Sequence, residues 1–345
     1  MIHTNRKWYE KHGPQGDVVI STRIRLARNL PKIPFPERMS QKQREQVEAA
    51  VHKAVEHGSA AIAQSLRYVN MQDVSRIEAI SMVERHLASP DFISQTSGRA
   101  LLLAADESIS VMVNEEDHVR MQIMMEGMNL EKAYQIASVL DDSLNSSLHF
   151  AFHKDLGYLT QCPTNLGTGM RASLMLHLPA LQESGIMNRI AGNLSKLGLA
   201  LRGTYGEGTH SVGALYQLSN QVSLGLSETE AIANLSTIVM QLMDQERKAR
   251  QQMVREVDKQ DQIFRSAAIL KSARVLSTDE MMKLLSHVRV GIACGLLSEI
   301  PYDTVNALMI RTQPATMSLA YGHEDAIPVQ ERDTLRAKIV AKALA

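Results

Sequence analysis

The strongest constraint on the fold is a change of hydrophobic pattern near residue 250 of this 345-residue chain. Before that point, short apolar segments of strand character alternate with helical patterns and with two glycine-rich loops. After it, apolar residues recur almost only at helical spacing. A polar stretch at 245–262 lies between the two patterns. We therefore predict an α+β domain over 1–250 and an all-helical C-terminal domain over 251–345.

Composition excludes several classes of protein. Lys plus Arg and Asp plus Glu both number 37, so no overall positive field would gather nucleic acid. The two cysteines, Cys162 and Cys294, are too few for a disulfide framework and lack metal-ligand spacing, which favours a reducing compartment. No apolar run approaches the ~18 residues of a membrane span, and the first residues lack a signal-peptide core. We predict a cytoplasmic protein that binds neither nucleic acid nor membrane.

Arginines are concentrated in the segment S-T-R-I-R-L-A-R at 21–28. In a strand, Arg23 and Arg25 point to the same face, because side chains two apart share a face. Two adjacent guanidinium groups repel each other unless an anion lies between them, and phosphate oxygens match their fork geometry. A solvated strand face, with partner carboxylates nearby, is an equally good interpretation of this segment alone.

Three consecutive carboxylates follow an apolar strand in N-E-E-D-H at 114–118, with Arg120 two residues beyond. Taken alone, this segment is most simply a charged turn. The functional interpretation is a carboxylate cluster that moves protons or binds a cation, with Arg120 directed at the same site as the first arginines.

Two glycine-rich loops complete the polar segments. In C-P-T-N-L-G-T-G-M-R (162–171) the glycines let the backbone approach an anion, and Arg171 adds a positive charge. This loop lacks the ending of a P-loop and the setting of a Rossmann motif. In R-G-T-Y-G-E-G-T (202–209) Arg202 precedes a mobile loop that carries Glu207. Each loop alone could be an ordinary turn, but the four segments together predict a phosphate-binding site.

In this order, the four segments resemble those of the ATP:guanidino phosphotransferases, the superfamily of creatine and arginine kinases. N-E-E-D-H combined with C-P-T-N-L-G-T-G-M-R is the strongest match. The resemblance implies an antiparallel sheet flanked by helices, and ATP with Mg²⁺ as cofactors. It implies roles for eight residues: ATP-binding Arg23, Arg25, Arg120, Arg171 and Arg202, acceptor-binding Glu116 and Glu207, and the nearby thiol of Cys162. No protein ligand of the metal is predicted. One phosphate-binding arginine of the phosphagen kinases is replaced here by Ser223.

Within this superfamily the chain most resembles the bacterial protein-arginine kinases. Its arginine pair lies close to the start, which leaves no room for the N-terminal helical domain that covers small guanidino substrates. It also continues into a helical tail that contains Arg332, Asp333 and Arg336 in the pattern R-D-x-x-R-A. The resemblance implies that these three residues bind phosphoarginine. From the residues alone, a surface helix with an exposed ion pair is the simpler interpretation.

The resemblance also implies partners and a biological setting. These are protein substrates marked for regulation or for degradation by a Clp protease, an activator protein, a homodimer formed by the tail, and a stress response. Two other functions stay open. One is a kinase for a small guanidino compound such as free arginine, and the other is a phosphoarginine-binding adaptor that has lost catalysis. The intact set of Glu116, Glu207 and five arginines argues against the adaptor.

Overall fold

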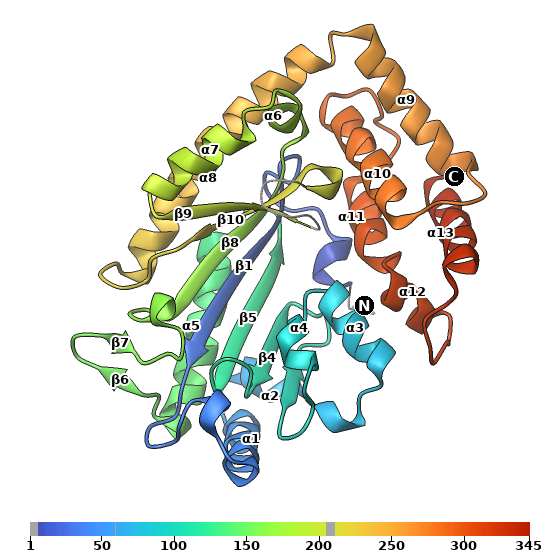
Figure 1. Cartoon of the computed structure of the whole chain (residues 1–345). Coiled ribbons are helices and arrows are strands. Elements are labelled where there is room, and N and C mark those ends of the chain that lie inside the picture. Colours follow the sequence, from blue (N-terminus) through green and yellow to red (C-terminus); the bar gives the residue numbers. More distant parts are fainter. Residues whose placement is uncertain (1–5, 59, 205–210) are drawn as a thin grey trace.

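The computed structural model describes residues 6–58, 60–204 and 211–345 (Figure 1). Its centre is an eight-stranded sheet in the order β2-β3-β4-β5-β1-β8-β10-β9, and every neighbouring pair is antiparallel. A small hairpin, β6-β7, lies apart from it. The strands are β1 (Val19–Arg28), β2 (Arg67–Asn70), β3 (Ala100–Leu103), β4 (Ile109–Val113), β5 (Val119–Glu126), β6 (Phe152–His153), β7 (Gly157–Tyr158), β8 (Met170–His177), β9 (Leu199–Gly203) and β10 (Leu215–Asn220).

Helices that form the main core cover one face of this sheet; on the opposite face a smaller apolar core lies over β2–β4, and the polar site lies over β1, β5 and β8. In β1, Ile24 and Leu26 are buried in the main core, whereas Arg23 and Arg25 alternate with them and point to the opposite face. The helices of this part are α1 (Gln41–Glu56), α2 (Ala61–Gln64), α3 (Arg76–Glu84), α4 (Pro90–Ile93), α5 (Leu130–Leu148), α6 (Pro179–Glu183), α7 (Met187–Lys196) and α8 (Glu228–Met253). Apolar residues of α1, α5, α7 and α8 form the main core together with the strands. The predicted antiparallel sheet with flanking helices is therefore confirmed.

The rest of the described chain is helical, as predicted. A second apolar core joins these helices, and it includes Leu215 of β10. The helix α12 packs beside α3, where the Glu84 carboxylate accepts hydrogen bonds from the backbone N–H groups of Ala315 and Thr316. The tail is therefore attached to the sheet domain by both apolar and polar contacts, and Figure 1 shows how its helices are arranged beside that domain. The helices are α9 (Val257–Ser272), α10 (Thr278–Ala293), α11 (Tyr302–Arg311), α12 (Pro314–Ala320) and α13 (Val329–Leu344).

Two charged residues of the polar stretch between the two patterns, Glu246 and Arg250, are buried, whereas the rest of the stretch is exposed or half-buried. The carboxylate of Glu246 is fully buried and accepts hydrogen bonds from the backbone of Ala180 and Leu181 at 3.1 and 3.0 Å. Arg250 donates to Glu246 at 2.7 Å and to the backbone carbonyls of Asp17 and His177. This buried pair therefore holds the end of α8 against α6 and against the backbone beside β1 and β8.

Replacing Arg250 with methionine is expected to destabilise the protein by about 3–5 kcal/mol, because it leaves the buried Glu246 carboxylate without its cation. Urea unfolding followed by circular dichroism measures this loss. Arg247→Met is the matched control, since Arg247 is one turn away and pairs with Asp17 at the surface. We expect that control to cost about 0–1 kcal/mol. Equal losses of unfolding free energy in the two variants would show that the buried pair stabilises the protein no more than the Arg247–Asp17 pair does.

Candidate active site

The sheet register brings arginines from three strands onto one face. Arg25 of β1 lies directly opposite Arg171 of β8, and its other neighbour is Gln122 of β5. Arg120 is two residues from Gln122 and therefore shares its face. Arg23 lies further along β1, where its guanidinium donates to Gln217 of β10 at 2.6 Å. Residues that are distant in the sequence thus form one cationic cluster.

This cluster has more positive charge than its surroundings neutralise. Burial, together with the charges of Arg120 and Arg171, lowers the pKa of Arg23 to about 10. Burial and three neighbouring arginines lower the pKa of Arg25 still further. The Nε atom of Arg25 is buried and has no hydrogen-bond partner among the described residues. Crowded guanidinium groups with a free buried donor fit a polyanion such as a triphosphate.

The first carboxylate of the N-E-E-D-H segment, Glu115, orients one of these arginines. Its side chain is buried, accepts a hydrogen bond from Ser89 at 2.6 Å and pairs with Arg120. Burial alone would raise the pKa of Glu115, but Arg120 and Ser89 more than offset it and lower that pKa. Glu115 therefore stays ionised and holds Arg120 in place.

The side chains of Asp117 and His118 form hydrogen bonds with other groups of the protein. The buried Asp117 carboxylate accepts hydrogen bonds from Asn29 and from the backbone of Gln161 at 2.7 and 2.8 Å. The Nδ1 atom of His118 accepts from the backbone N–H of Leu30, so Nε2 carries the proton and donates to the carbonyl of Pro34. Both residues hold the turn between β4 and β5 and have structural roles.

Glu116 differs from its neighbours because no hydrogen bond or ion pair of the described residues involves its carboxylate. It is half-buried and lines a cavity of about 120 Å³. Burial and the adjacent Asp117 raise the pKa of Glu116. The same cavity is lined by Arg25, Arg120, Arg171 and Cys162. Five of the eight residues that the sequence pointed to therefore meet around one small space.

The loop that carries Cys162 is tightly held. Gly167 has φ of 99°, and a Cβ atom there would lie 2.2 Å from the carbonyl oxygen of Ser223. The hydroxyl of Ser223, which is buried, reaches the carbonyl oxygens of Thr164 and Leu166 at 3.0 and 2.8 Å. Ser223 occupies the position of a phosphagen-kinase arginine, yet here it holds the glycine-rich loop.

Replacing Ser223 with alanine is expected to destabilise the protein by about 1–2 kcal/mol, because two buried carbonyl groups lose their shared donor. Chemical denaturation measures the change. Ser195→Ala, on the exposed surface of α7, is a suitable control and should be neutral. A neutral Ser223→Ala variant would show that the loop keeps its shape without this hydroxyl.

Another predicted site residue, Arg202, lies on the edge strand of the sheet. Arg202 lies on β9 opposite Gln217, and its side chain is exposed. Its charge helps to lower the pKa of Arg171, after the larger effect of burial, so the two guanidinium groups are near each other. Glu207 is outside the described residues.

The tail motif lies on α13. Arg336 is fully buried and donates to the carbonyls of Thr312 and Leu276 at 3.0 and 2.8 Å, and it also pairs with Asp333. Arg332 lies 3.6 Å from the same carboxylate. The Nε atom of Arg332 and one Nη atom of Arg336 have no hydrogen-bond partner among the described residues. This motif is therefore more buried than an exposed surface ion pair.

Comparison with known proteins places the chain in a family. The ATP:guanido phosphotransferase C-terminal catalytic domain matches residues 46–249, and the protein-arginine kinase McsB C-terminal domain matches residues 256–345. A protein-arginine kinase from Symbiobacterium thermophilum is 43% identical over 341 residues, which cover 98% of this chain and 96% of that protein. The chain belongs to the protein-arginine kinase family. Another member, from Desulforamulus reducens, is 45% identical and covers 98% of this chain and 95% of its own length.

Solved structures agree with this family at the level of the sheet domain. The duplicated taurocyamine kinase from Schistosoma mansoni with bound transition-state analogue components is 31% identical, with a TM-score of 0.61. That match covers 67% of this chain and 33% of the duplicated enzyme. Lombricine kinase is 25% identical with a TM-score of 0.60, over 68% of this chain and 67% of the other. The architecture of this protein-arginine kinase family member is thus that of the guanidino kinases.

Several supporting residues gave no signal in the sequence. Gln217 contacts Arg23, and Ser89 and Asn29 contact the two carboxylates beside Glu116, but all three are isolated polar residues far from the motifs that they support. Only Ser223 could have been noticed in advance, because it replaces an arginine at an otherwise recognisable position.

Proposed function

We propose that this chain is a kinase that transfers the γ-phosphate of ATP to arginine side chains of proteins. The observation that carries the proposal is the cavity in which Arg25, Arg120 and Arg171 meet Glu116 and Cys162. It combines a cationic wall, suited to phosphate, with a carboxylate that forms no hydrogen bond or ion pair with the described residues. Such a site can hold a phosphoryl donor and a cationic acceptor side by side.

On the donor side, five arginines would bind the phosphates: Arg23, Arg25, Arg120, Arg171 and Arg202. Their like charges repel one another, so a bound triphosphate stabilises the cluster and receives preorganised hydrogen-bond donors. Mg²⁺ would arrive with the nucleotide, held mainly by phosphate oxygens and water, and would neutralise further charge. Transfer needs this neutralisation because charge spreads over the phosphoryl oxygens in the transition state.

On the acceptor side, Glu116 would bind the guanidinium group together with Glu207. A guanidinium has a pKa above ~12 and no free lone pair, so it must lose a proton as it attacks phosphorus. Glu116 has its carboxylate free and its pKa raised, and both properties suit a proton acceptor. Cys162 would lie against the acceptor group. The role of Glu207 follows from the family resemblance.

The tail would recognise the product of the reaction. Arg332 and Arg336 each have a buried N–H without a partner among the described residues, which can donate to a phosphate, and Asp333 offers a carboxylate to a guanidinium group. We propose that phosphoarginine binds there. This use would require the pair between Arg336 and Asp333 to rearrange in part.

The family resemblance supports the wider setting that we propose. The kinase part would be residues 1–250, and residues 251–345 would bind phosphoarginine and form a homodimer. The enzyme would act in the cytoplasm in response to stress, with an activator protein, and marked proteins would be regulated or delivered to a Clp protease. In the described part of the chain, no helix is long and apolar enough to cross a membrane.

Two incubations with γ-labelled ATP test the proposed acceptor. One contains free arginine and the other contains an unfolded protein, and in both the acid-labile label is measured. We expect label on the protein and little turnover of the free amino acid. Fast turnover of free arginine without labelled protein would favour the small-molecule guanidino kinase. No transfer in either incubation, with retained binding of phosphoarginine, would favour the adaptor.

A further inference from the structure

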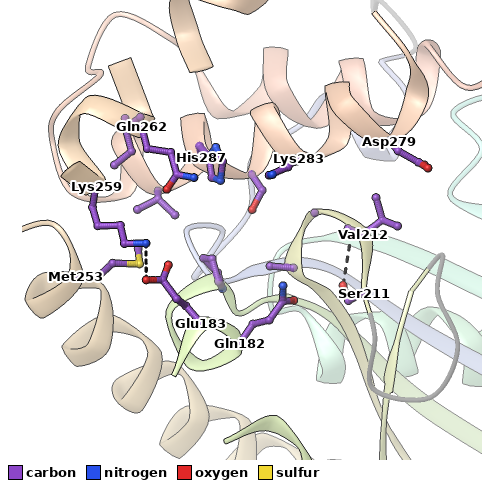
Figure 2. A pocket seen from close by; sticks show the side chains of 16 residues that line it. Gln182, Glu183, Ser211, Val212, Met253, Lys259, Gln262, Asp279, Lys283 and His287 are labelled. Carbon is purple, nitrogen blue, oxygen red and sulfur yellow. Dashed lines mark hydrogen bonds and ion pairs between the residues drawn. The ribbon is translucent and has the colours of Figure 1, made fainter. Parts of the chain in front are cut away.

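A second and larger cavity lies between the sheet domain and the helical tail. Its volume is about 460 Å³, within the range typical of small-molecule sites. Figure 2 shows α9 and α10 on one side of it and Gln182 and Glu183 of α6 on the other. Segment 211–214, which leads into β10, closes a further side. None of the residues proposed for catalysis or for phosphoarginine lines this cavity.

Three polar residues of α10 line it together. Lys283, Ser286 and His287 are spaced three and four residues apart, so they share one face of the helix. Lys283 is exposed and takes part in no hydrogen bond or ion pair of the described residues. The other lysine of the cavity, Lys259, is paired with Glu183 at 2.5 Å. Lys283 is therefore the cation that stays available to a ligand.

The hydroxyl of Ser286 can donate a hydrogen bond to a ligand in the cavity. Arg250 donates to Nδ1 of His177 at 3.2 Å, so the proton of that imidazole is on Nε2. His177 Nε2 then donates to the Ser286 oxygen at 2.8 Å. The hydroxyl hydrogen of Ser286 has no acceptor among the hydrogen bonds of the described residues. A buried serine whose oxygen already accepts a hydrogen bond thus offers its proton at the cavity wall.

His287 offers its other ring nitrogen. The Ser266 hydroxyl donates to the carbonyl of Gln262 at 2.6 Å, so Ser266 must accept from Nδ1–H of His287 at 2.8 Å. This leaves Nε2 free, which becomes a donor when the ring is protonated. Burial, Lys283 and Lys259 lower the pKa of His287, and Glu183 acts in the opposite direction. A bound anion would favour the protonated ring.

The chemistry of these groups indicates the ligand. An ammonium, a hydroxyl donor and an imidazole that can become cationic match the three oxygens of a phosphate group. Asp279 also lines the cavity, but Figure 2 shows its side chain directed away from the other polar groups. The remaining wall has three uncharged polar residues, Gln182, Ser211 and Gln262, and an apolar part formed mainly by Val212, Met253, Ile263 and Val290. The apolar part would accommodate a compact hydrocarbon or ring.

We propose that this cavity binds a small phosphate monoester with an apolar body, through Lys283, Ser286 and protonated His287. The site is separate from the arginine cluster and does not depend on the identity of the phosphoryl acceptor. Because its walls come from α6, segment 211–214 and the tail helices, a ligand there would also hold the two parts of the chain together.

Nuclear magnetic resonance of histidine side chains in the full-length protein tests the proposal, with the signal of His287 identified from His287→Gln. Phenyl phosphate is the probe, and benzyl alcohol and inorganic phosphate are compared with it. We expect a saturable shift of the His287 signal and a rise in its pKa with phenyl phosphate. Inorganic phosphate should bind more weakly, and benzyl alcohol should not produce the rise in pKa.

Variants give the decisive comparison. Lys283→Met should weaken binding of phenyl phosphate about fivefold to tenfold, and Ser286→Ala should weaken it as well. Lys271→Met, an exposed change on α9 outside the cavity, should leave it unchanged. The thermal unfolding midpoint of each variant shows that it is folded. The proposal is overturned by the absence of a saturable His287 shift up to ~10 mM probe, or by equal affinities of Lys283→Met and the unaltered protein.

Discussion

Replacing Glu116 with glutamine is expected to lower kcat about 10²–10⁴-fold, with little effect on stability. The amide keeps the size of the side chain but cannot accept a proton or balance the charge of a guanidinium group. Stability should change little because the Glu116 carboxylate takes part in no hydrogen bond or ion pair of the described residues. Steady-state kinetics with a protein substrate measure the first effect, and urea unfolding measures the second.

Glu131→Gln is the matched control for this variant. Glu131 is a glutamate exposed on the first turn of α5, and it does not line the cavity. The control should keep full activity. Unchanged turnover in Glu116→Gln would mean that the carboxylate that handles the acceptor lies elsewhere.

Replacing Arg25 with methionine is expected to lower the activity but raise the stability of the protein without nucleotide. Activity, as kcat/KM, should fall about 10²–10³-fold because a preorganised donor to the phosphates is lost. Stability without nucleotide should rise by about 1 kcal/mol, because the change removes a crowded charge and a buried N–H without a partner. ATP should also stabilise the variant less than the unaltered protein, since it binds less tightly.

Thermal unfolding with and without ATP measures this second pair of effects. Arg189→Met, an exposed change on α7, serves as the control and should affect neither quantity. If Arg25→Met were strongly destabilised without nucleotide, Arg25 would be a structural residue, and the cationic cluster would not be built for an anion.

Much of the fold could be predicted because its signals are local. Ser40 and Ser227 begin helices through capping boxes, in which each serine and the residue three positions later satisfy each other's backbone N–H groups. The alternation of Ile24 and Leu26 with arginines likewise fixed which face of β1 is polar. Such patterns depend only on neighbouring residues, so a single sequence contains them.

The sequence could not predict which residue of each motif is free to bind a ligand and which has a structural role, because this depends on distant residues. Arg28 belongs to the same segment as Arg25, yet it is buried against Asp141, which lies 113 positions away. Glu115 and Asp117 flank Glu116, and their carboxylates accept hydrogen bonds from Ser89 and Asn29, respectively. Three adjacent carboxylates look equivalent in the sequence, and only their packing distinguishes them.

The packing of α8 against the rest of the sheet domain could not be predicted from the sequence either. Glu246 and Arg250 look like residues of a charged surface, but both are buried, because Ala180, Leu181 and Asp17 offer them backbone partners. A glutamate and an arginine four positions apart look the same in the sequence whether the ion pair is buried or exposed. Their difference arises only when α6 and α8 pack together.

The proposed protein-arginine kinase activity is tested most directly by mapping phosphorylated residues after incubation with ATP and an unfolded protein. Mass spectrometry under conditions that preserve P–N bonds identifies the modified side chains, and Glu116→Gln provides the background. The proposal predicts phosphate on arginine side chains, at a level that falls at least about 10²-fold in this variant. Phosphate found only on hydroxyl side chains, or no phosphate on the protein, would contradict it.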